Sequence, residues 1–322
     1  PPIFPGRYDV STAVQANNGS ATVISQSSYG DIAFNTDGTK LFALGDSDVV
    51  AEYHLGTAFN VSTAVHAGEQ EDFIISGEES SPTGLNFNND GTKMFVLGRD
   101  GDAVVEYTLG TAFDISTAVY AGQNEEFSIA IQENDPRGFT FNADGTKMYV
   151  LGFERRVIIE YSLDTAFDVS TAMYLGLDEE FSTSTEEYSA QDIAFNDDGS
   201  KMFVIGGSSK DVVEYNLFTS YDVSTAIYAG ASEEFYHGRF GTRIPSRLIF
   251  NNDGTKLFIL DNIPYGGVYE YVLDNPNTVS FAENGAGTVI DIQATDGDGG
   301  ATDEGLTYSI SGGTDAGAFN ID

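Results

Sequence analysis

Apolar and polar residues follow one pattern five times along the chain, around the segment Phe-Asn-x-Asp-Gly-Thr/Ser-Lys. In the second copy, residues 84–88 alternate between apolar and polar side chains, and residues 93–98 form a nearly continuous apolar run. Alternation is typical of a half-buried strand, and a short unbroken run is typical of a strand covered on both faces. The Asp-Gly pair between them indicates a hairpin, because glycine accepts the positive φ of a tight turn.

Two more strands are expected in the same copy, at 103–109 and 113–120, and no segment of the unit has a helical pattern. The sequence therefore predicts a four-stranded antiparallel unit. The turn aspartates lie 53, 54, 54 and 55 residues apart, a spacing that indicates supersecondary units stacked on copies of themselves. These aspartates are Asp37, Asp90, Asp144, Asp198 and Asp253.

The two ends of the repeat region complement each other. Residues 8–14 match the fourth strand of the unit, whereas the last copy stops after its third strand, at 269–273. Pairing these ends would close a ring and complete the last sheet. The pattern resembles the bacterial β-propeller repeats with an Asp-Gly-Thr-Lys-Met-Phe-Val signature, which occur in large secreted or surface proteins. The resemblance covers roughly residues 6–274 and implies an all-β, five-bladed propeller of four-stranded antiparallel blades, which we assign to residues 1–274.

After residue 274 the composition shifts to small and acidic residues. Residues 279–284 and 289–298, with their Ala-Glu-Asn and Asp-x-Asp segments, resemble the first half of a cadherin-like repeat. We therefore expect residues 275–322 to form an incomplete cadherin-like β segment. The resemblance implies calcium as a cofactor, with Glu283, Asp296 and Asp298 as ligands, and oxygen ligands of this kind suit calcium.

The net charge of the chain limits the classes of molecule that we expect it to bind. The chain has 50 acidic and 14 basic residues and a net charge of −36, which argues against nucleic acid or an anionic membrane as a partner and favours cations or a saline environment. The chain contains no cysteine, so disulfides and thiolate chemistry are excluded. Membrane insertion is not expected, because no apolar stretch is long enough to span a bilayer. An extracellular or cell-surface location follows from the resemblance.

The first and third turns are nearly identical in every copy, whereas the second turns and inter-blade loops differ. We therefore expect a ligand site on the face that carries the variable segments, where seven of the eight arginines lie. Arginine can clamp a carboxylate, sulfate or sugar, and tyrosine can stack on sugar rings. The alternative is that these side chains pair and pack locally. The candidate ligand-binding residues are Tyr29, Asp31, Arg99, Asp100, Arg137, Arg155, Tyr188, Asp192, His237, Arg239, Arg243, Arg247, Asp261 and Tyr265.

The resulting hypothesis is an extracellular adhesion or binding module for a glycan or another extracellular polymer, without enzymatic activity. Two alternatives stay open. One is a structural subunit of a self-assembling or tandem filament, whose tail strands pair with a neighbouring copy or with downstream cadherin-like domains. The other is a propeller hydrolase, a glycosidase or lactonase, that uses a carboxylate pair such as Asp31 and Asp192. The sequence contains no zinc-ligand spacing, nucleophile elbow or phosphate loop.

Overall fold

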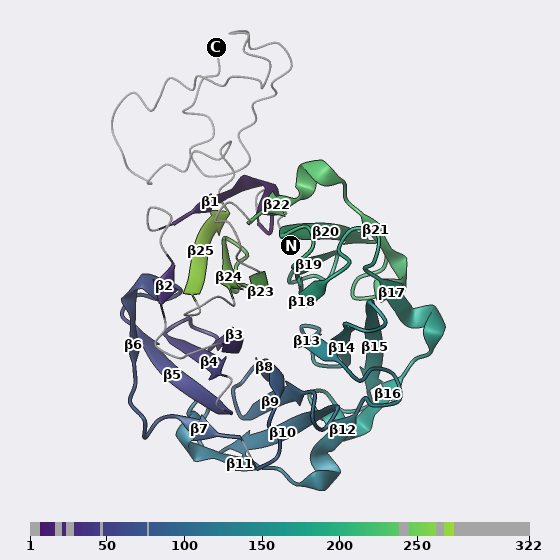
Figure 1. The fold of residues 1–322 in the computed structure, drawn as a ribbon. Helices are drawn as coiled ribbons and strands as arrows, with labels where there is room; N and C mark the ends of the chain where they lie inside the picture. Colours follow the sequence, from purple (N-terminus) through teal and green to yellow (C-terminus); the bar gives the residue numbers. More distant parts are fainter. Residues whose placement is uncertain are drawn as a thin grey trace, which may run out of the picture. The chain divides into compact units, whose positions relative to one another are not determined.

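The computed structural model describes residues 7–16, 21–23, 29–45, 48–75, 77–237, 245–261 and 267–273. All of them lie in the first of the two units into which the chain divides, 1–277 and 278–322. Five antiparallel sheets surround a central channel in sequence order (Figure 1), so the five-bladed β-propeller predicted from the repeat is confirmed. No helix among the described residues is long and apolar enough to cross a membrane.

Each blade starts with an inner strand at the channel and continues outward through a second and a third strand. The inner strands are β3 (Tyr29–Phe34), β8 (Pro82–Phe87), β13 (Pro136–Phe141), β18 (Ala190–Phe195) and β23 (Pro245–Phe250). The second strands are β4 (Lys40–Gly45), β9 (Lys93–Gly98), β14 (Lys147–Gly152), β19 (Lys201–Gly206) and β24 (Lys256–Asp261). The third strands are β5 (Val49–Leu55), β10 (Ala103–Leu109), β15 (Val157–Leu163), β20 (Asp211–Leu217) and β25 (Gly267–Leu273). Blades 1 to 5 are numbered in this order.

The outer strand of each blade consists of two short pieces that pair with opposite halves of the third strand. The first pieces are β6 (Ala64–His66), β11 (Ala118–Tyr120), β16 (Ala172–Tyr174), β21 (Ala226–Tyr228) and β1 (Ala13–Gln15). The second pieces are β7 (Phe73–Ile74), β12 (Glu126–Ser128), β17 (Glu180–Ser182), β22 (Phe235–Tyr236) and β2 (Thr22–Val23). Short 3₁₀ turns precede these pieces: η1 (Val10–Thr12), η3 (Val61–Thr63), η4 (Ile115–Thr117), η5 (Gln123–Glu125), η6 (Val169–Thr171), η7 (Leu177–Glu179), η8 (Val223–Thr225) and η9 (Ala231–Glu233).

The N-terminal segment closes the ring, as the sequence predicts. Strand β1 pairs with β25 so that Ala13 lies opposite Leu273, and β2 pairs with the other half of β25 so that Thr22 lies opposite Val268. Blade 5 is therefore built from both ends of the propeller region. Closure of this kind removes the unpaired edges that a linear array of blades would leave.

The hydrophobic core lies between neighbouring blades. At every junction the phenylalanine of the Phe-Asn motif packs against an aromatic side chain on the second strand of the preceding blade. The ring centroids of Phe42 and Phe87, for example, are 4.7 Å apart. Such a pair contributes about 0.5–1.5 kcal/mol beyond the burial of its area. The repeated phenylalanine is therefore explained by packing between blades.

A charged pair also lies in each blade, and in blades 1, 2, 3 and 5 its lysine bonds to the next blade. The Lys93 ammonium lies 2.7 Å from Oε1 of Glu106 in its own blade and donates a 2.9 Å hydrogen bond to the carbonyl oxygen of Phe167 in the next blade. The same lysine–glutamate pair recurs in all five blades, and these glutamates are buried. We call each of these lysine–glutamate pairs a junction latch.

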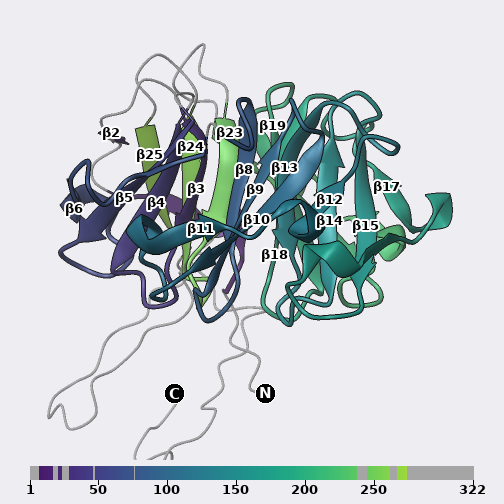
Figure 2. The same cartoon turned by 90° about the horizontal axis from the view of Figure 1, so that it is seen from below.

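The Asp-Gly turns need glycine for two reasons. Gly38 has φ +70°, a backbone conformation that disfavours other residues. A Cβ there would also lie 2.3 Å from the ring of Phe59, which belongs to the third turn of the same blade. The backbone N–H of Phe59 donates a 2.8 Å hydrogen bond to the carbonyl oxygen of Gly38, so the first and third turns form one surface. We call this surface the repeated face and the opposite one the variable face; the strands run between them (Figure 2).

Candidate binding cavity in the central channel

The inner strands point alternate residues into the channel, and one level of these residues carries charge. This level consists of Asp31, Gly84, Gly138, Asp192 and Arg247, one residue from each blade, and we call it the axial charge layer. The next level towards the repeated face carries no charged side chain and consists of Ala33, Asn86, Thr140, Ala194 and Ile249. Sequence analysis named Asp31, Asp192 and Arg247 as site candidates, and the structure brings these three together.

The Arg247 side chain crosses the channel and is 4% exposed. Its guanidinium donates hydrogen bonds to the carbonyl oxygens of Thr83 in blade 2, Arg137 in blade 3 (2.9 Å) and Gln191 in blade 4 (3.2 Å). Its Nε lies 3.5 Å from Oδ1 of Asp31 in blade 1. Since Arg247 itself belongs to blade 5, one side chain joins all five blades and closes the channel at this level.

The two aspartates of the axial charge layer tie their blades to the following ones. Asp31 accepts 2.7 Å hydrogen bonds from the backbone N–H groups of Ile32 and of Leu85 in blade 2. Asp192 accepts a 3.0 Å bond from the N–H of Leu248 in blade 5. Both carboxyls are buried, so their positions are fixed by backbone donors on neighbouring strands.

Burial also changes the acidity of this pair. Loss of solvent raises the pKa of Asp31 to about 6, against the opposing effect of the Arg247 guanidinium. Loss of solvent and then the charge of Asp31 raise the pKa of Asp192 to about 8. Near neutral pH this coupled pair therefore retains a proton more readily than free carboxyls do, because two buried acids share one guanidinium.

Glycine occupies the other two positions because no side chain fits there. A Cβ on Gly138 would lie 2.4 Å from Oδ1 of Asp192, and a Cβ on Gly84 would lie 2.6 Å from the ring of Phe139. Neither glycine has an unusual φ, so the requirement is for space alone. The two glycines leave the room that Asp192 and Arg247 occupy in the channel.

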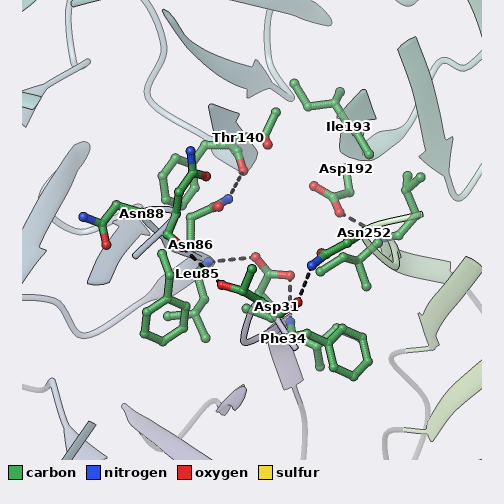
Figure 3. Close-up of a pocket in the computed structure, with 18 of the residues that line it drawn as sticks. Asp31, Phe34, Leu85, Asn86, Asn88, Thr140, Asp192, Ile193 and Asn252 are labelled. Atoms are coloured by element: carbon green, nitrogen blue, oxygen red, sulfur yellow. Dashed lines mark hydrogen bonds between the residues drawn. The ribbon is translucent and has the colours of Figure 1, made fainter. Parts of the chain in front are cut away.

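A cavity of about 360 Å³ fills the half of the channel between the axial charge layer and the first turns. Asp31 and Asp192 form its closed end, and Asn86, Thr140 and Ile193 lie along its wall (Figure 3). Exposure increases along this path: the two aspartates are buried, Asn86 and Thr140 are partly exposed, and the first-turn residue Asn252 is exposed. The cavity therefore opens on the repeated face, and its closed end lies at the axial charge layer.

Hydrogen bonds between first turns surround part of the opening. Thr36 donates a 3.1 Å bond from its hydroxyl to the carbonyl oxygen of Asn89, and the Asn89 amide donates a 2.8 Å bond to the carbonyl oxygen of Ala143. Asn252 donates in the same way to the carbonyl oxygen of Thr36. Ala143 and Asp197 have no side-chain donor to continue the series, so the rim differs between blades 3, 4 and 5.

Three of the predicted residues lie on the variable face, and two of them, Arg137 and Arg99, lie close to Asp135. Arg137 Nη2 donates a 2.9 Å hydrogen bond to Oδ2 of Asp135, and its guanidinium lies 4.4 Å from the ring centroid of Phe153. Arg99 Nη1 is 3.6 Å from Oδ1 of the same aspartate. Asp100 accepts a hydrogen bond from the hydroxyl of Ser80.

Two other predicted residues lie further along this face. Arg155 forms a bidentate pair with Glu180, with N···O distances of 2.9 and 2.5 Å. Tyr188 is 56% exposed, and its ring is covered by the Arg156 guanidinium at 3.7 Å from the centroid. The described arginines of this face thus have partners within the chain, which is the local pairing considered as the alternative above.

His237 and Asp261 form a buried pair. His237 Nε2 lies 2.7 Å from Oδ1 of Asp261, and Nδ1 lies 2.7 Å from the hydroxyl oxygen of Tyr271. Both side chains are at most 2% exposed. In this position they connect the end of blade 4 to blade 5 and face the core instead of a ligand.

Sequence analysis missed a set of buried glutamates in the inter-blade loops: Glu79, Glu133 and Glu187. Glu187 accepts backbone N–H bonds from Ser189, Ser208 and Ser209, at 2.7, 3.0 and 2.9 Å, and so fixes the second turn of blade 4. The glutamates fill the space beside Gly98, Gly152 and Gly206, each at the end of a second strand. Blade 5 has Asp261 at that strand end, and there the pair with His237 takes the place of the glutamate.

Several predicted site residues lie outside the described residues. These are Arg239, Arg243 and Tyr265, and the expected calcium ligands Glu283, Asp296 and Asp298. Tyr29 begins β3, but its side chain is also outside the described part.

Acidic groups that fit a cation occur at two blade junctions. Carboxylate oxygens of Glu106, Glu125 and Asp168 lie within 4.8 Å of one another, and Glu160, Glu179 and Asp222 repeat the arrangement one blade further. Glu106 and Glu160 are already paired with Lys93 and Lys147 of the junction latches. Since each lysine supplies a positive charge to its group, we assign no metal to them.

Comparisons with known proteins identify no family. No protein-family model matches the chain. A stretch of 45 residues, 14% of the chain, is 47% identical to part of Halomucin from Haloquadratum walsbyi (strain DSM 16790 / HBSQ001). The matched stretch is such a small part of Halomucin that its share of that protein's length is 0% to the nearest per cent. The chain is thus similar to a small part of a far longer protein.

Similar solved structures share little sequence with this chain. A suggested 6-phosphogluconolactonase from Bacteroides fragilis NCTC 9343 is 14% identical over 78% of this chain and 76% of that chain, with a TM-score of 0.46. Hydrazine synthase from Kuenenia stuttgartiensis is 15% identical over 76% of this chain and 58% of that chain (TM-score 0.42). The β-propeller domain of Cps50 (Swd1) from Myceliophteria thermophila is 12% identical over 75% and 65% (TM-score 0.43). We infer no function from these similarities.

Proposed function

We propose that this chain is a binding module of an extracellular surface protein, without catalytic activity, and that its axial cavity receives a small polar group of a glycan or another extracellular polymer. The observation that carries the proposal is the cavity of about 360 Å³, which is open on the repeated face and has the buried carboxyls of Asp31 and Asp192 at its closed end. Ligand sites are typically concave, with a few polar groups at fixed positions.

The surface location rests on composition and similarity. The net charge of −36 suits a protein exposed to a saline medium, and the short match to Halomucin supports a place in a large surface protein. The proposal moves the ligand from the variable face to the repeated face, since the described arginines of the variable face pair within the chain.

Binding without catalysis fits the geometry of the acid pair. A glycosidase needs one carboxyl that delivers a proton and a second that attacks the sugar or activates water. Both oxygens of Asp31 accept backbone N–H bonds, and Arg247 lies against it. Such an aspartate is suited to hold a fixed charge, so we expect no hydrolysis of glycosides or lactones.

A blocked cavity tests the binding function. Ala194 lines the cavity without belonging to the axial charge layer, so Ala194→Trp fills the space and leaves the charges in place. On an array of neutral, acidic and amine-bearing glycans, we expect at least a tenfold loss of binding for Ala194→Trp and none for Tyr188→Ala on the variable face. The reverse result would place the ligand on the variable face and refute the proposal.

The outer strands favour a second function, as a subunit of a filament. Each blade exposes one aliphatic side chain at the centre of its first outer piece, between 54% and 67% exposed: Val14, Val65, Val119, Met173 and Ile227. Exposed edge strands with apolar residues tend to pair with other chains. Sedimentation at high salt tests this: assembly that Val119→Lys abolishes would support the filament, and a monomer at every concentration would exclude it.

Calcium binding by the tail is proposed on the cadherin-like resemblance alone. Glu283, Asp296 and Asp298 would supply oxygen ligands. Calcium titration of the full chain should show a site that Asp296→Asn with Asp298→Asn removes, and a titration without heat or spectral change would refute it.

A further inference from the structure

The axial charge layer contains one more acidic group than basic groups. Asp31 and Asp192 bring two carboxyls to the closed end of the cavity, and one guanidinium, that of Arg247, lies beside Asp31. All three side chains are at least nine-tenths buried, so solvent screens them little. Among the described residues, the other titratable group that lines the cavity is Asp197, which is exposed at the opening and also acidic.

In the free protein, a bound proton neutralises the excess negative charge of this layer. With both aspartates ionised the layer would carry a net charge of −1, and an unbalanced charge in a buried site is unfavourable. The raised pKa of Asp192, about 8, shows the consequence: the pair keeps one proton at neutral pH. A positively charged ligand in the cavity would supply the same balance.

We propose that the group received by the axial cavity is an organic ammonium, such as the amine of an amino sugar or a lysine-like side chain, instead of a neutral sugar. This inference rests on the proposed function and specifies its ligand. The exchange is balanced: the ammonium enters beside the aspartate pair, the carboxylic acid of Asp192 loses its proton to solvent, and the charge of the site stays at zero.

The walls of the cavity favour an organic cation over a metal ion. Between the charge layer and the opening lie the channel-facing residues Ala33, Ala194 and Ile249, whose apolar side chains suit the carbon atoms attached to an amine. A calcium ion takes six to eight oxygen ligands, whereas both oxygens of Asp31 already accept backbone N–H bonds. The volume of about 360 Å³ also far exceeds the space of one ion.

Isothermal titration with ethanolamine and with ethylene glycol, its counterpart without the amine, tests the inference on the full chain. We expect ethanolamine to bind at least tenfold more tightly at pH 8. At pH 7, titrations in buffers of different ionisation enthalpy should show release of about one proton for each ethanolamine bound. Its affinity should rise about tenfold per pH unit between pH 6 and 7.5, because the proton that it displaces becomes easier to remove.

Asp192→Asn is the matched variant. Asparagine keeps an acceptor for the N–H of Leu248 but supplies no negative charge. We expect a tenfold or larger loss of ethanolamine affinity and no proton release, with a cooperative melting transition at least as high as that of wild type as the check of folding. Equal affinity for ethanolamine and ethylene glycol, an absence of proton release, or tighter binding of calcium chloride at the same site would each overturn the inference.

The two proposals fail in different ways. If Ala194→Trp abolishes glycan binding but charged and neutral probes bind wild type equally, the cavity is the binding site and the ammonium is wrong. If Ala194→Trp leaves the binding of every array glycan unchanged, the proposed function is wrong, and the inference falls with it.

Discussion

The junction latches and the axial charge layer use charged residues in opposite ways. Every junction repeats one lysine and one buried glutamate, whereas the axial layer has two aspartates, two glycines and one arginine. The junctions are separate places around the ring, so one solution serves five times. On the axis all five side chains meet at one place, where five equal charges would repel and five equal side chains would collide. The five blades therefore cannot all carry the same side chain at this level of the channel.

The largest effect is expected at a junction latch. Lys93→Met leaves Glu106 buried without its partner, and removal of one member of a buried pair costs about 3 kcal/mol of unfolding free energy. Chemical denaturation measures the loss. The double variant Lys93→Met with Glu106→Gln should recover part of it, and a single variant as stable as wild type would show that the latch contributes nothing.

A smaller effect is expected for the residue that joins all five blades. Arg247→Met removes three hydrogen bonds to backbone carbonyls of other blades and the counter-charge of Asp31, at a cost of about 2 kcal/mol at pH 8. The pKa of both aspartates is raised, so both take up protons as the pH falls and need less counter-charge, and the loss should be smaller at pH 5. Denaturation at the two pH values measures the difference, and an equal loss at both would contradict an electrostatic role.

Space in the charge layer can be tested with a single methyl group. Gly138→Ala places a Cβ 2.4 Å from Oδ1 of Asp192 and should lower the unfolding free energy by about 1–2 kcal/mol. Gly77→Ala is the control, because a Cβ there meets no atom within 4 Å. If both variants melt like wild type, Asp192 does not occupy the position described.

The last prediction concerns a substitution that should stabilise the protein, whereas the three above should destabilise it. The pKa of Asp192 is raised from 3.8 to about 8 on folding, so the folded state holds a proton that the unfolded state releases between these values. Its contribution to stability is therefore present below pH 3.8 and is lost as the pH rises towards 8. Asp192→Asn removes this loss, and its melting temperature should rise relative to wild type from pH 4 to pH 8. A difference that does not depend on pH would refute the raised pKa.

The turn aspartates provide an internal reference for that measurement. Hydrogen bonds from the side chain and backbone of Thr39 lower the pKa of Asp37, and the same holds for Asp90 with Thr92. Their contribution is present above the ordinary pKa and is lost as the pH falls through the lowered value. It therefore acts below about pH 4, outside the range in which Asp192 titrates.

The repeat pattern determined the architecture. Five Asp-Gly turns with alternating and continuous apolar runs predicted five blades, and the surplus N-terminal strand predicted the closure by β1 and β25. Local chemistry decides these features, because glycine in a tight turn and a period of two along a strand are properties of short segments. The same comparison of copies also marked Asp31, Asp192 and Arg247 as exceptions.

Only the tertiary structure decided what those exceptions do and which face the cavity opens on. Arg247 donates hydrogen bonds to the carbonyl oxygens of Thr83, Arg137 and Gln191. No local sequence pattern predicts contacts between residues so far apart in the chain. Whether a charge is exposed or buried depends likewise on packing of whole blades, as Glu187 shows. The repeated sequence determines the fold of one blade, whereas the channel forms only when all five blades pack together.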